Sequence, residues 1–125
     1  MTSCGTLSST PLIKGEWLKP GAHLDLVGGF KPDMREADDT AIRRAQVFVD
    51  TRAGAMKEAG DIVQPLKSGV LTEAAIRSEL SELVRGTRPG RRNDNDITLF
   101  KSVGAALEDL AGAILAYDHA RGQPA

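Results

Sequence analysis

The feature that most constrains the fold is a strand–helix–strand pattern in the first half of the chain. Residues 22–27 (AHLDLV) and 45–50 (AQVFVD) are short apolar segments, the second rich in β-branched and aromatic residues. Between them, residues 38–45 (DDTAIRRA) have the apolar spacing of a short helix. Two strands joined by a helix are most simply a right-handed parallel crossover, so the pattern predicts an α/β fold with a parallel sheet.

The remaining strand signals predict a small sheet. The N-terminal segment 1–13 reads either as a frayed tail or as the end of a strand whose beginning is missing. With that strand end, three strands are expected. Residues 97–100 (ITLF) form a further short strand or an extended segment.

Four helical segments are expected around this sheet. Asp33 and Glu36, three residues apart, resemble a capping pattern before the first helix. After residue 50, a short helical turn is expected to end at Gly60. Residues 72–86 (TEAAIRSELSELVRG) have the pattern of an amphipathic helix. A long C-terminal helix follows, with Ser102 placed to cap its start.

Composition excludes several classes of protein. The chain has 125 residues and a formal charge of −1, which suits one domain without the basic excess of a nucleic-acid-binding protein. No apolar run approaches the ~20 residues of a membrane span, and the first ten residues lack the Lys or Arg of a secretory signal. A cytoplasmic location is expected. Cys4 is the only cysteine, and His23 and His119 stand alone, so neither a disulfide nor a metal site is expected.

Ligands of open α/β sheets bind beyond the carboxyl ends of the strands, and several residues follow such ends. Gly28 and Gly29 either let a flat or charged ligand approach the backbone or make a tight turn. The hydroxyls of 6–10 (TLSST) suit ribose, phosphate or carboxamide, or form a Ser/Thr turn. Ser102 binds an anion or caps its helix, and Glu58 handles a proton or is solvated. The G-x-G-x-x-G fingerprint is absent, so these residues alone do not establish a nucleotide site.

Three longer stretches carry a resemblance to a known family. They read SSTPLIKGEWLKPGAHLDLVGGFKPDMREADD, VFVDTRAGAMKEAGD and ITLFKSVGAALEDLAGAILAY. In this order, from about Thr6 to Tyr117, they resemble the ornithine cyclodeaminase/mu-crystallin family. Its members include NAD(P)H-dependent ketimine reductases, archaeal-type alanine dehydrogenase and ornithine cyclodeaminase. They are homodimers with a Rossmann domain and a separate substrate/dimerisation domain.

The resemblance covers only the C-terminal portion of the family. It implies that residues 1–101 are the second half of an NAD(P)-binding Rossmann domain. Residues 102–125 then form the C-terminal helix that returns to the absent substrate/dimerisation domain. The glycine-rich phosphate loop, and the residue that selects NADH or NADPH, would lie upstream of Met1. The implied fold is a partial, doubly wound parallel sheet with flanking helices.

The resemblance also assigns residues to the cofactor NAD(P)H and to a small imino or amino acid substrate. The implied cofactor contacts are Thr6, Leu7, Ser8, Val27, Gly28 and Ser102. The implied substrate-pocket residues are Gly29, Phe30 and Glu58. Val27 and Gly28 would pass under the nicotinamide ring, where bulk cannot be accepted, and Glu58 is the candidate pocket carboxylate.

Phe30 is the informative departure from the family pattern. Cyclodeaminases have an aspartate at this position and a lysine near the position of Met34. An aromatic side chain cannot exchange protons, so we predict a fragment of a reductase of cyclic imino acids, of the Δ1-pyrroline-2-carboxylate or Δ1-piperideine-2-carboxylate type. The alternatives are an ornithine cyclodeaminase, a non-catalytic ligand-binding protein, or an inactive truncated product.

Overall fold

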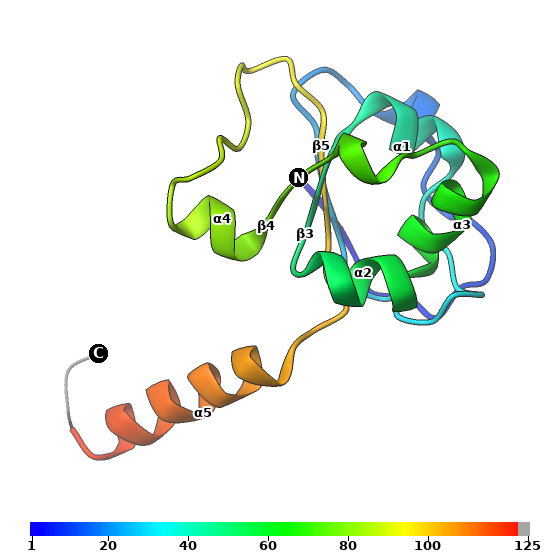
Figure 1. Cartoon of the computed structure of the whole chain (residues 1–125). Coiled ribbons are helices and arrows are strands. Elements are labelled where there is room, and N and C mark those ends of the chain that lie inside the picture. Colours follow the sequence, from blue (N-terminus) through cyan, green and yellow to red (C-terminus); the bar gives the residue numbers. More distant parts are fainter. Residues whose placement is uncertain (123–125) are drawn as a thin grey trace.

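The computed structural model describes residues 1–122, which form a five-stranded sheet with every strand pairing parallel (Figure 1). The order across the sheet is β1-β2-β5-β3-β4. The strands are β1 (Thr2–Cys4), β2 (His23–Leu26), β3 (Gln46–Val49), β4 (Ile76–Glu79) and β5 (Thr98–Lys101).

The predicted parallel α/β sheet is confirmed, but it has five strands where three and a further short or extended segment were expected. Strands β2 and β3 are parallel, yet β5 lies between them, because Thr98 aligns with His23 on one side and with Gln46 on the other. The segment expected as a short strand or extended piece is therefore the central strand. The N-terminal segment forms the edge strand β1, as one of its two readings predicted.

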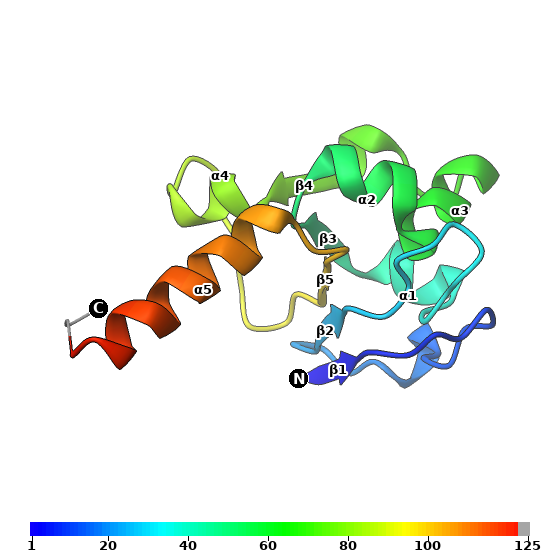
Figure 2. The ribbon, with the colours of Figure 1, turned by 90° about the horizontal axis from the view of Figure 1, so that it is seen from below.

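Three helices cover one face of the sheet (Figure 2). They are α1 (Asp39–Arg44), α2 (Arg52–Glu58) and α3 (Gly60–Ser68). Helix α1 matches its prediction, but the Asp33–Glu36 capping pattern is wrong. Asp38 is the N-cap, and its side chain accepts a hydrogen bond from the Ala41 amide at 2.9 Å.

The core lies between these helices and the sheet. Alternate strand residues point toward the helices, as the two-residue period of a strand requires. They pack against apolar residues of the helices. The buried cluster includes Leu24, Leu26, Val47, Val49, Ile76 and Leu99 from the strands, with Ala41, Ile42, Ala55, Ala59 and Ile62 from the helical side.

The predicted amphipathic helix over residues 72–86 is wrong. A short 3-10 helix (Glu73–Ala75) leads into β4, and the helix α4 (Leu80–Val84) begins only afterwards. Ile76 and Ser78 are buried and Arg77 is exposed, which is the alternation of a strand that pairs with β3. The i, i+4 spacing of Ile76 and Leu80 imitated a helical stripe, although Leu80 is exposed.

The prediction that Gly60 ends a helix is wrong. Gly60 is the first residue of α3, a helix that the sequence pattern did not predict. Its Cα faces the loop before α1 so closely that an added Cβ would lie 1.7 Å from the Met34 carbonyl oxygen. The chain bends at Ala59, whose backbone is extended, and this separates α2 from α3. The glycine therefore permits close packing at a helix start.

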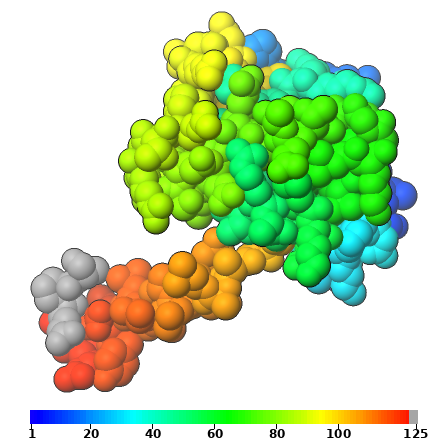
Figure 3. Space-filling view, viewed as in Figure 1, coloured from blue at the N-terminus to red at the C-terminus, as the bar shows by residue number. Residues whose placement is uncertain are grey.

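The C-terminal helix α5 (Ala106–Ala120) projects away from the rest of the molecule (Figure 3). Its N-cap is Ala105, so the prediction that Ser102 caps it is wrong. None of its residues is buried. Its apolar side chains are more than half exposed: Leu107, Leu110, Ile114, Leu115 and Tyr117. Residues 123–125, the end of the predicted unit 102–125, lie outside the described residues, and the domain division stays a prediction.

Candidate functional site

The loops that follow β1, β2 and β5 meet at one edge of the sheet. These three strands are neighbours, and parallel strands bring their carboxyl ends to the same edge. Thr6, Gly28 and Ser102 follow those ends by one or two residues. The structure therefore gathers residues that the sequence resemblance assigned to cofactor binding.

Glu36 joins the first two of these loops. Its side chain is fully buried, and its Oε1 accepts hydrogen bonds from the Thr6 amide at 2.6 Å and the Thr6 hydroxyl at 2.9 Å. Its Oε2 accepts from the amides of Gly28 at 2.9 Å and Gly29 at 3.3 Å. One carboxylate therefore holds the strand-end loops of β1 and β2 together.

The hydrogen bonds to Glu36 decide its ionisation. Burial alone would raise the pKa of the carboxyl group, since it disfavours the charged form. The hydrogen bonds from Thr6, together with those from the Cys4 thiol and the Gly29 amide, outweigh burial and hold the pKa below its ordinary value. Glu36 is therefore a buried anion with its acceptor capacity filled.

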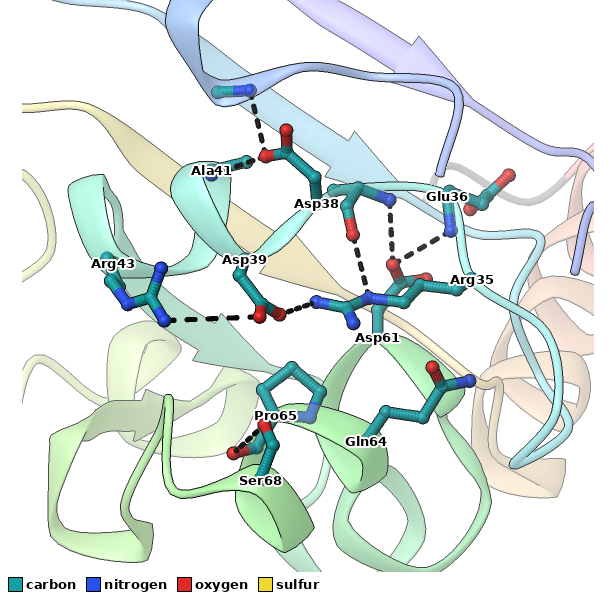
Figure 4. A network of polar contacts seen from close by, with 12 residues as sticks. Arg35, Glu36, Asp38, Asp39, Ala41, Arg43, Asp61, Gln64, Pro65 and Ser68 are labelled. Carbon is teal, nitrogen blue, oxygen red and sulfur yellow. Dashed lines mark hydrogen bonds and ion pairs between the residues drawn. The ribbon is translucent and has the colours of Figure 1, made fainter. Parts of the chain in front are cut away.

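Asp61, at the start of α3, supports Glu36 from below (Figure 4). Its Oδ1 accepts hydrogen bonds from the amides of Glu36 and Ala37, each at 2.9 Å. Its Oδ2 is buried and has no hydrogen-bond partner among residues 1–122. Burial raises the pKa of this carboxyl group, against the lowering effect of its two backbone donors and the nearby Lys101 ammonium.

Lys101, the last residue of β5, supplies a buried positive charge at this edge. Its Nζ donates to the carbonyl oxygens of Leu26 at 3.1 Å and Ser102 at 2.8 Å. Burial lowers the pKa of its ammonium group, while Asp61, Glu36 and other nearby carboxylates act in the opposite direction. Lys101 thereby ties the end of β2 to the end of β5 and offsets the buried carboxylates.

Asp50, immediately after β3, holds the turn that leads to α5. Its Oδ2 accepts hydrogen bonds from the amides of Val103 at 2.7 Å and Gly104 at 2.9 Å, and from the Ser102 hydroxyl at 3.3 Å. Its Oδ1 accepts from the Thr51 amide at 2.6 Å. The Ser102 hydroxyl, predicted to contact the cofactor, therefore lies on a turn fixed by a carboxylate from the neighbouring strand.

The two glycines after β2 are required by the protein itself. A Cβ on Gly28 would lie 2.0 Å from the Thr6 carbonyl oxygen and 2.5 Å from Glu36 Oε1. A Cβ on Gly29 would lie 2.5 Å from Asp61 Oδ2. Packing against the β1 loop and the two carboxylates thus explains the absence of side chains, without a ring above Gly28. Cofactor contact by Gly28 stays a prediction.

Replacing Gly28 with alanine is expected to lower the free energy of unfolding by about 3 kcal/mol, because the new methyl group displaces backbone and a hydrogen-bonded carboxylate. Gly5→Ala is the matched control, since its Cβ meets nothing within 4 Å. Urea unfolding of both variants without cofactor measures the difference. Equal stability of Gly28→Ala and the parent protein would contradict the packing explanation.

Four of the other predicted site residues are exposed. Leu7 and Val27 are exposed beside the joined loops, at 70% and 49% of their surface, and so offer apolar surface there. Phe30 is 42% exposed and follows Gly29 directly, with the Lys31 ammonium 5.8 Å from its ring centre. Glu58 is exposed at the last residue of α2, with no hydrogen bond or ion pair within the described part of the chain.

The buried charged residues of this edge were missed as site residues by sequence reasoning. The sequence pattern places Glu36 in a helix cap and Asp50 at the end of a strand, and neither position by itself indicates a buried charge. Lys101 follows the run 97–100 directly in the sequence, and a charge at that place is a signal of a buried charged residue. Within residues 1–122, no group of three or more His, Cys, Asp or Glu side chains is arranged to hold a metal ion. No helix in that range is long and apolar enough to cross a membrane.

A parallel sheet with helices on one face, and with glycine and hydroxyl residues gathered at its carboxyl edge, defines part of a Rossmann-like nucleotide-binding fold. The family model for the ornithine cyclodeaminase/mu-crystallin family matches residues 1–124. The chain belongs to this family, and the resemblance found in the sequence is confirmed.

Three similar proteins illustrate the relationship. Ketimine reductase mu-crystallin from Macropus fuliginosus is 42% identical over 90% of this chain and 33% of its own length. The structure of Thermococcus litoralis Δ1-pyrroline-2-carboxylate reductase with NADH and L-proline has a TM-score of 0.90 and 42% identity, covering 96% of this chain and 37% of that one. A dimer of an archaeal alanine dehydrogenase with bound NAD has a TM-score of 0.87 and 30% identity, with the same coverage.

The chain corresponds to only part of the relatives that it matches. It spans about a third of the length of the curated relatives it matches. The parts of those relatives outside the match have no counterpart among its residues. Activity, substrate and assembly of a whole protein of this kind are therefore matters for the proposal that follows.

Proposed function

We propose that this chain supplies the nicotinamide-facing part of an NAD(P)H-dependent reductase of cyclic imino acids of the Δ1-pyrroline-2-carboxylate or Δ1-piperideine-2-carboxylate type. The observation that carries the proposal is the pair of strand-end loops joined by Glu36, beside the open apolar surface of Leu7 and Val27. Similarity to reductases of this kind supports it. A cytoplasmic, homodimeric whole protein is part of the proposal, and similarity to the alanine dehydrogenase dimer supports the second point.

The residues at the sheet edge fit a nicotinamide cofactor by their chemistry. Leu7 and Val27 present apolar side chains to one side of a flat ring, and Ser8 and Ser102 carry hydroxyl groups for polar substituents. The Thr6 hydroxyl and the Gly28 amide already donate to Glu36, and the hydroxyls of Ser8 and Ser102 already donate to the Thr10 carbonyl oxygen at 2.7 Å and to Asp50 Oδ2 at 3.3 Å. The serine hydroxyls therefore offer a remaining lone pair as an acceptor for a polar substituent of the cofactor.

When bound, the reduced cofactor supplies a hydride for the C=N carbon of the imine. The tasks left to this chain are to position the cofactor and the substrate and to exclude water. Glu36 fixes the loops that carry Leu7 and Val27, and Asp50 fixes the turn that carries Ser102. Because these groups are set before a ligand binds, little reorganisation remains for the reacting complex.

Phe30 gives the proposal its choice of reaction. Its ring lies exposed one residue after Gly29, where it can form an apolar wall of the substrate pocket. The phenyl ring cannot donate or accept a proton. This position therefore lacks the carboxylate that a cyclodeaminase uses to act on the substrate amine. The proton that completes imine reduction comes from water or from a group outside this chain.

The test uses a whole protein that contains this chain. With NADH or NADPH and Δ1-pyrroline-2-carboxylate or Δ1-piperideine-2-carboxylate, reduced cofactor is expected to be consumed. Ornithine with NAD+ is expected to release no ammonia. Phe30→Asp is expected to lower kcat/KM for imine reduction by about tenfold or more, because it places a charge in an apolar wall. Phe30→Leu is the matched control and is expected to keep most of the activity.

Two outcomes would overturn the proposal. One is efficient ammonia release from ornithine by the parent protein, with imine reduction unchanged in Phe30→Asp. The other is tight binding of NADPH with no turnover of any imino acid, which would indicate a non-catalytic ligand-binding role. A titration with NADPH alone, followed by the reduction assay, separates the two.

A further inference from the structure

A pocket lies beside the edge strand β4, away from the loops of the proposed cofactor site. Its volume is about 590 Å³, and its lining includes Arg52, Glu73, Ile76, Arg77, Arg88 and Arg92. The cofactor loops follow β1, β2 and β5, whereas β4 is at the opposite end of the strand order. In Figure 1, the loop that carries Arg88 and Arg92 arches out beside α4.

The lining is strongly basic. Four arginines from three segments meet one carboxylate, Glu73, on the walls of the pocket. The guanidinium groups of Arg77 and Arg92 have no hydrogen-bond or carboxylate partner within residues 1–122, and both side chains are exposed. This pocket therefore presents two exposed guanidinium groups without a carboxylate partner among residues 1–122, although the net charge of the chain is −1.

The other two arginines are only loosely neutralised. Arg52 lies 3.8 Å from Glu79 and 3.9 Å from Glu82, and Arg88 lies 3.8 Å from Glu82. These separations exceed a hydrogen-bond length, so the N–H groups of Arg88, and those of Arg52 that do not bond to Ile76, remain free to donate to a stronger partner. Arg52 donates a 3.0 Å hydrogen bond to the Ile76 carbonyl oxygen, and this bond holds its guanidinium group at the pocket.

We infer that this pocket binds a small ligand bearing two or more phosphate groups. Guanidinium groups pair with phosphate oxygens through two parallel hydrogen bonds, and phosphate is the dianion that most rewards such an arrangement. The four arginines come from α2, β4 and the loop, so a ligand with two or more phosphate groups can pair with more of them than a single phosphate can. The volume is that of a small-molecule site rather than a macromolecular surface.

The binding test uses the chain as it stands and inorganic tripolyphosphate as the probe, with ADP as an organic diphosphate in a second arm. Isothermal titration at constant ionic strength is expected to show saturable binding. Arg77→Ala with Arg92→Ala is expected to weaken it at least about tenfold, since each arginine removes charge-assisted hydrogen bonds. Arg43→Ala with Arg121→Ala removes the same charge from exposed positions elsewhere and is the matched control.

Backbone amide shifts locate the ligand and separate this inference from the proposed function. Tripolyphosphate is expected to move the signals of residues 73–77 and 88–92. Shifts confined to Thr6, Gly28 and Ser102 would place the anion at the proposed cofactor site and overturn this inference while leaving the reductase proposal intact. Absence of binding, or equal weakening in the control variant, would also overturn it, the latter because it indicates general charge attraction. Tighter binding of ADP than tripolyphosphate would identify a nucleotide as the ligand class.

Discussion

Glu36→Ala is expected to lower the free energy of unfolding by about 3–5 kcal/mol. The change removes the acceptor for donors from Thr6, Gly28 and Gly29, and leaves the two glycine amides buried and the Thr6 donors part-buried without a partner. Asp33→Ala, at an exposed carboxylate three residues away, is the matched control and should stay within about 0.5 kcal/mol of the parent. Urea unfolding measures both.

Acid titration gives this prediction a second measurement. The pKa of Glu36 is held below its ordinary 4.5 in the folded chain, so its contribution to stability is present above that value and is lost as the pH falls through the lower folded pKa. The raised pKa of Asp61 acts with the opposite sign. Glu36→Gln keeps Asp61 and removes the titrating group, so its stability should fall less on acidification than that of the parent. Parallel pH profiles, or a Glu36→Ala variant as stable as Asp33→Ala, would contradict the role of Glu36.

Lys101→Met is expected to destabilise the fold by about 3–5 kcal/mol as well. It removes the donor to Leu26 and Ser102 and leaves the carboxylates of Glu36 and Asp61 without their buried counter-charge. Lys67→Met, at an exposed position near the end of α3, is the matched control and should change stability by less than about 0.5 kcal/mol.

A double variant distinguishes charge balance from simple loss of packing. Adding Asp61→Asn to Lys101→Met removes one of the uncompensated carboxylates, so part of the lost stability should return. Asp61→Asn alone gives the other side of the cycle. Strict additivity of the two changes would show that Lys101 and Asp61 do not interact, and the electrostatic account of this edge would fail.

The class of fold could be predicted because its signals are local. The apolar β-forming runs around Leu24 and Val47 and the short helix between them specify strand, helix and strand wherever they lie in the sheet. The insertion of β5 between β2 and β3 was beyond reach, since strand order depends on contacts between residues up to 75 positions apart. The segment around Ile76 shows the other limit: a strand of four residues that runs into a short helix has the spacing of a single helix.

The candidate site was predictable in position and less so in its chemistry. Residues without a side chain, such as Gly28 and Gly29, mark a strand end in the sequence itself. The partners that require those glycines, Glu36 and Asp61, come from a loop and a helix that only tertiary packing brings to them. A buried carboxylate and a surface carboxylate look alike in a sequence, which is why Glu36 and Asp50 were not recognised.

The hydrogen bonds from Val103 and Gly104 to Asp50 also affect the direction of helix α5. Helix α5 has 15 residues and so extends about 22 Å from that point, with no other part of its surface buried. Because the helix is held only near its first residue, a rotation of about 10° at Gly104 would move its far end by about 4 Å. The direction in which helix α5 projects thus depends on the hydrogen bonds of one side chain, Asp50, at the end of β3.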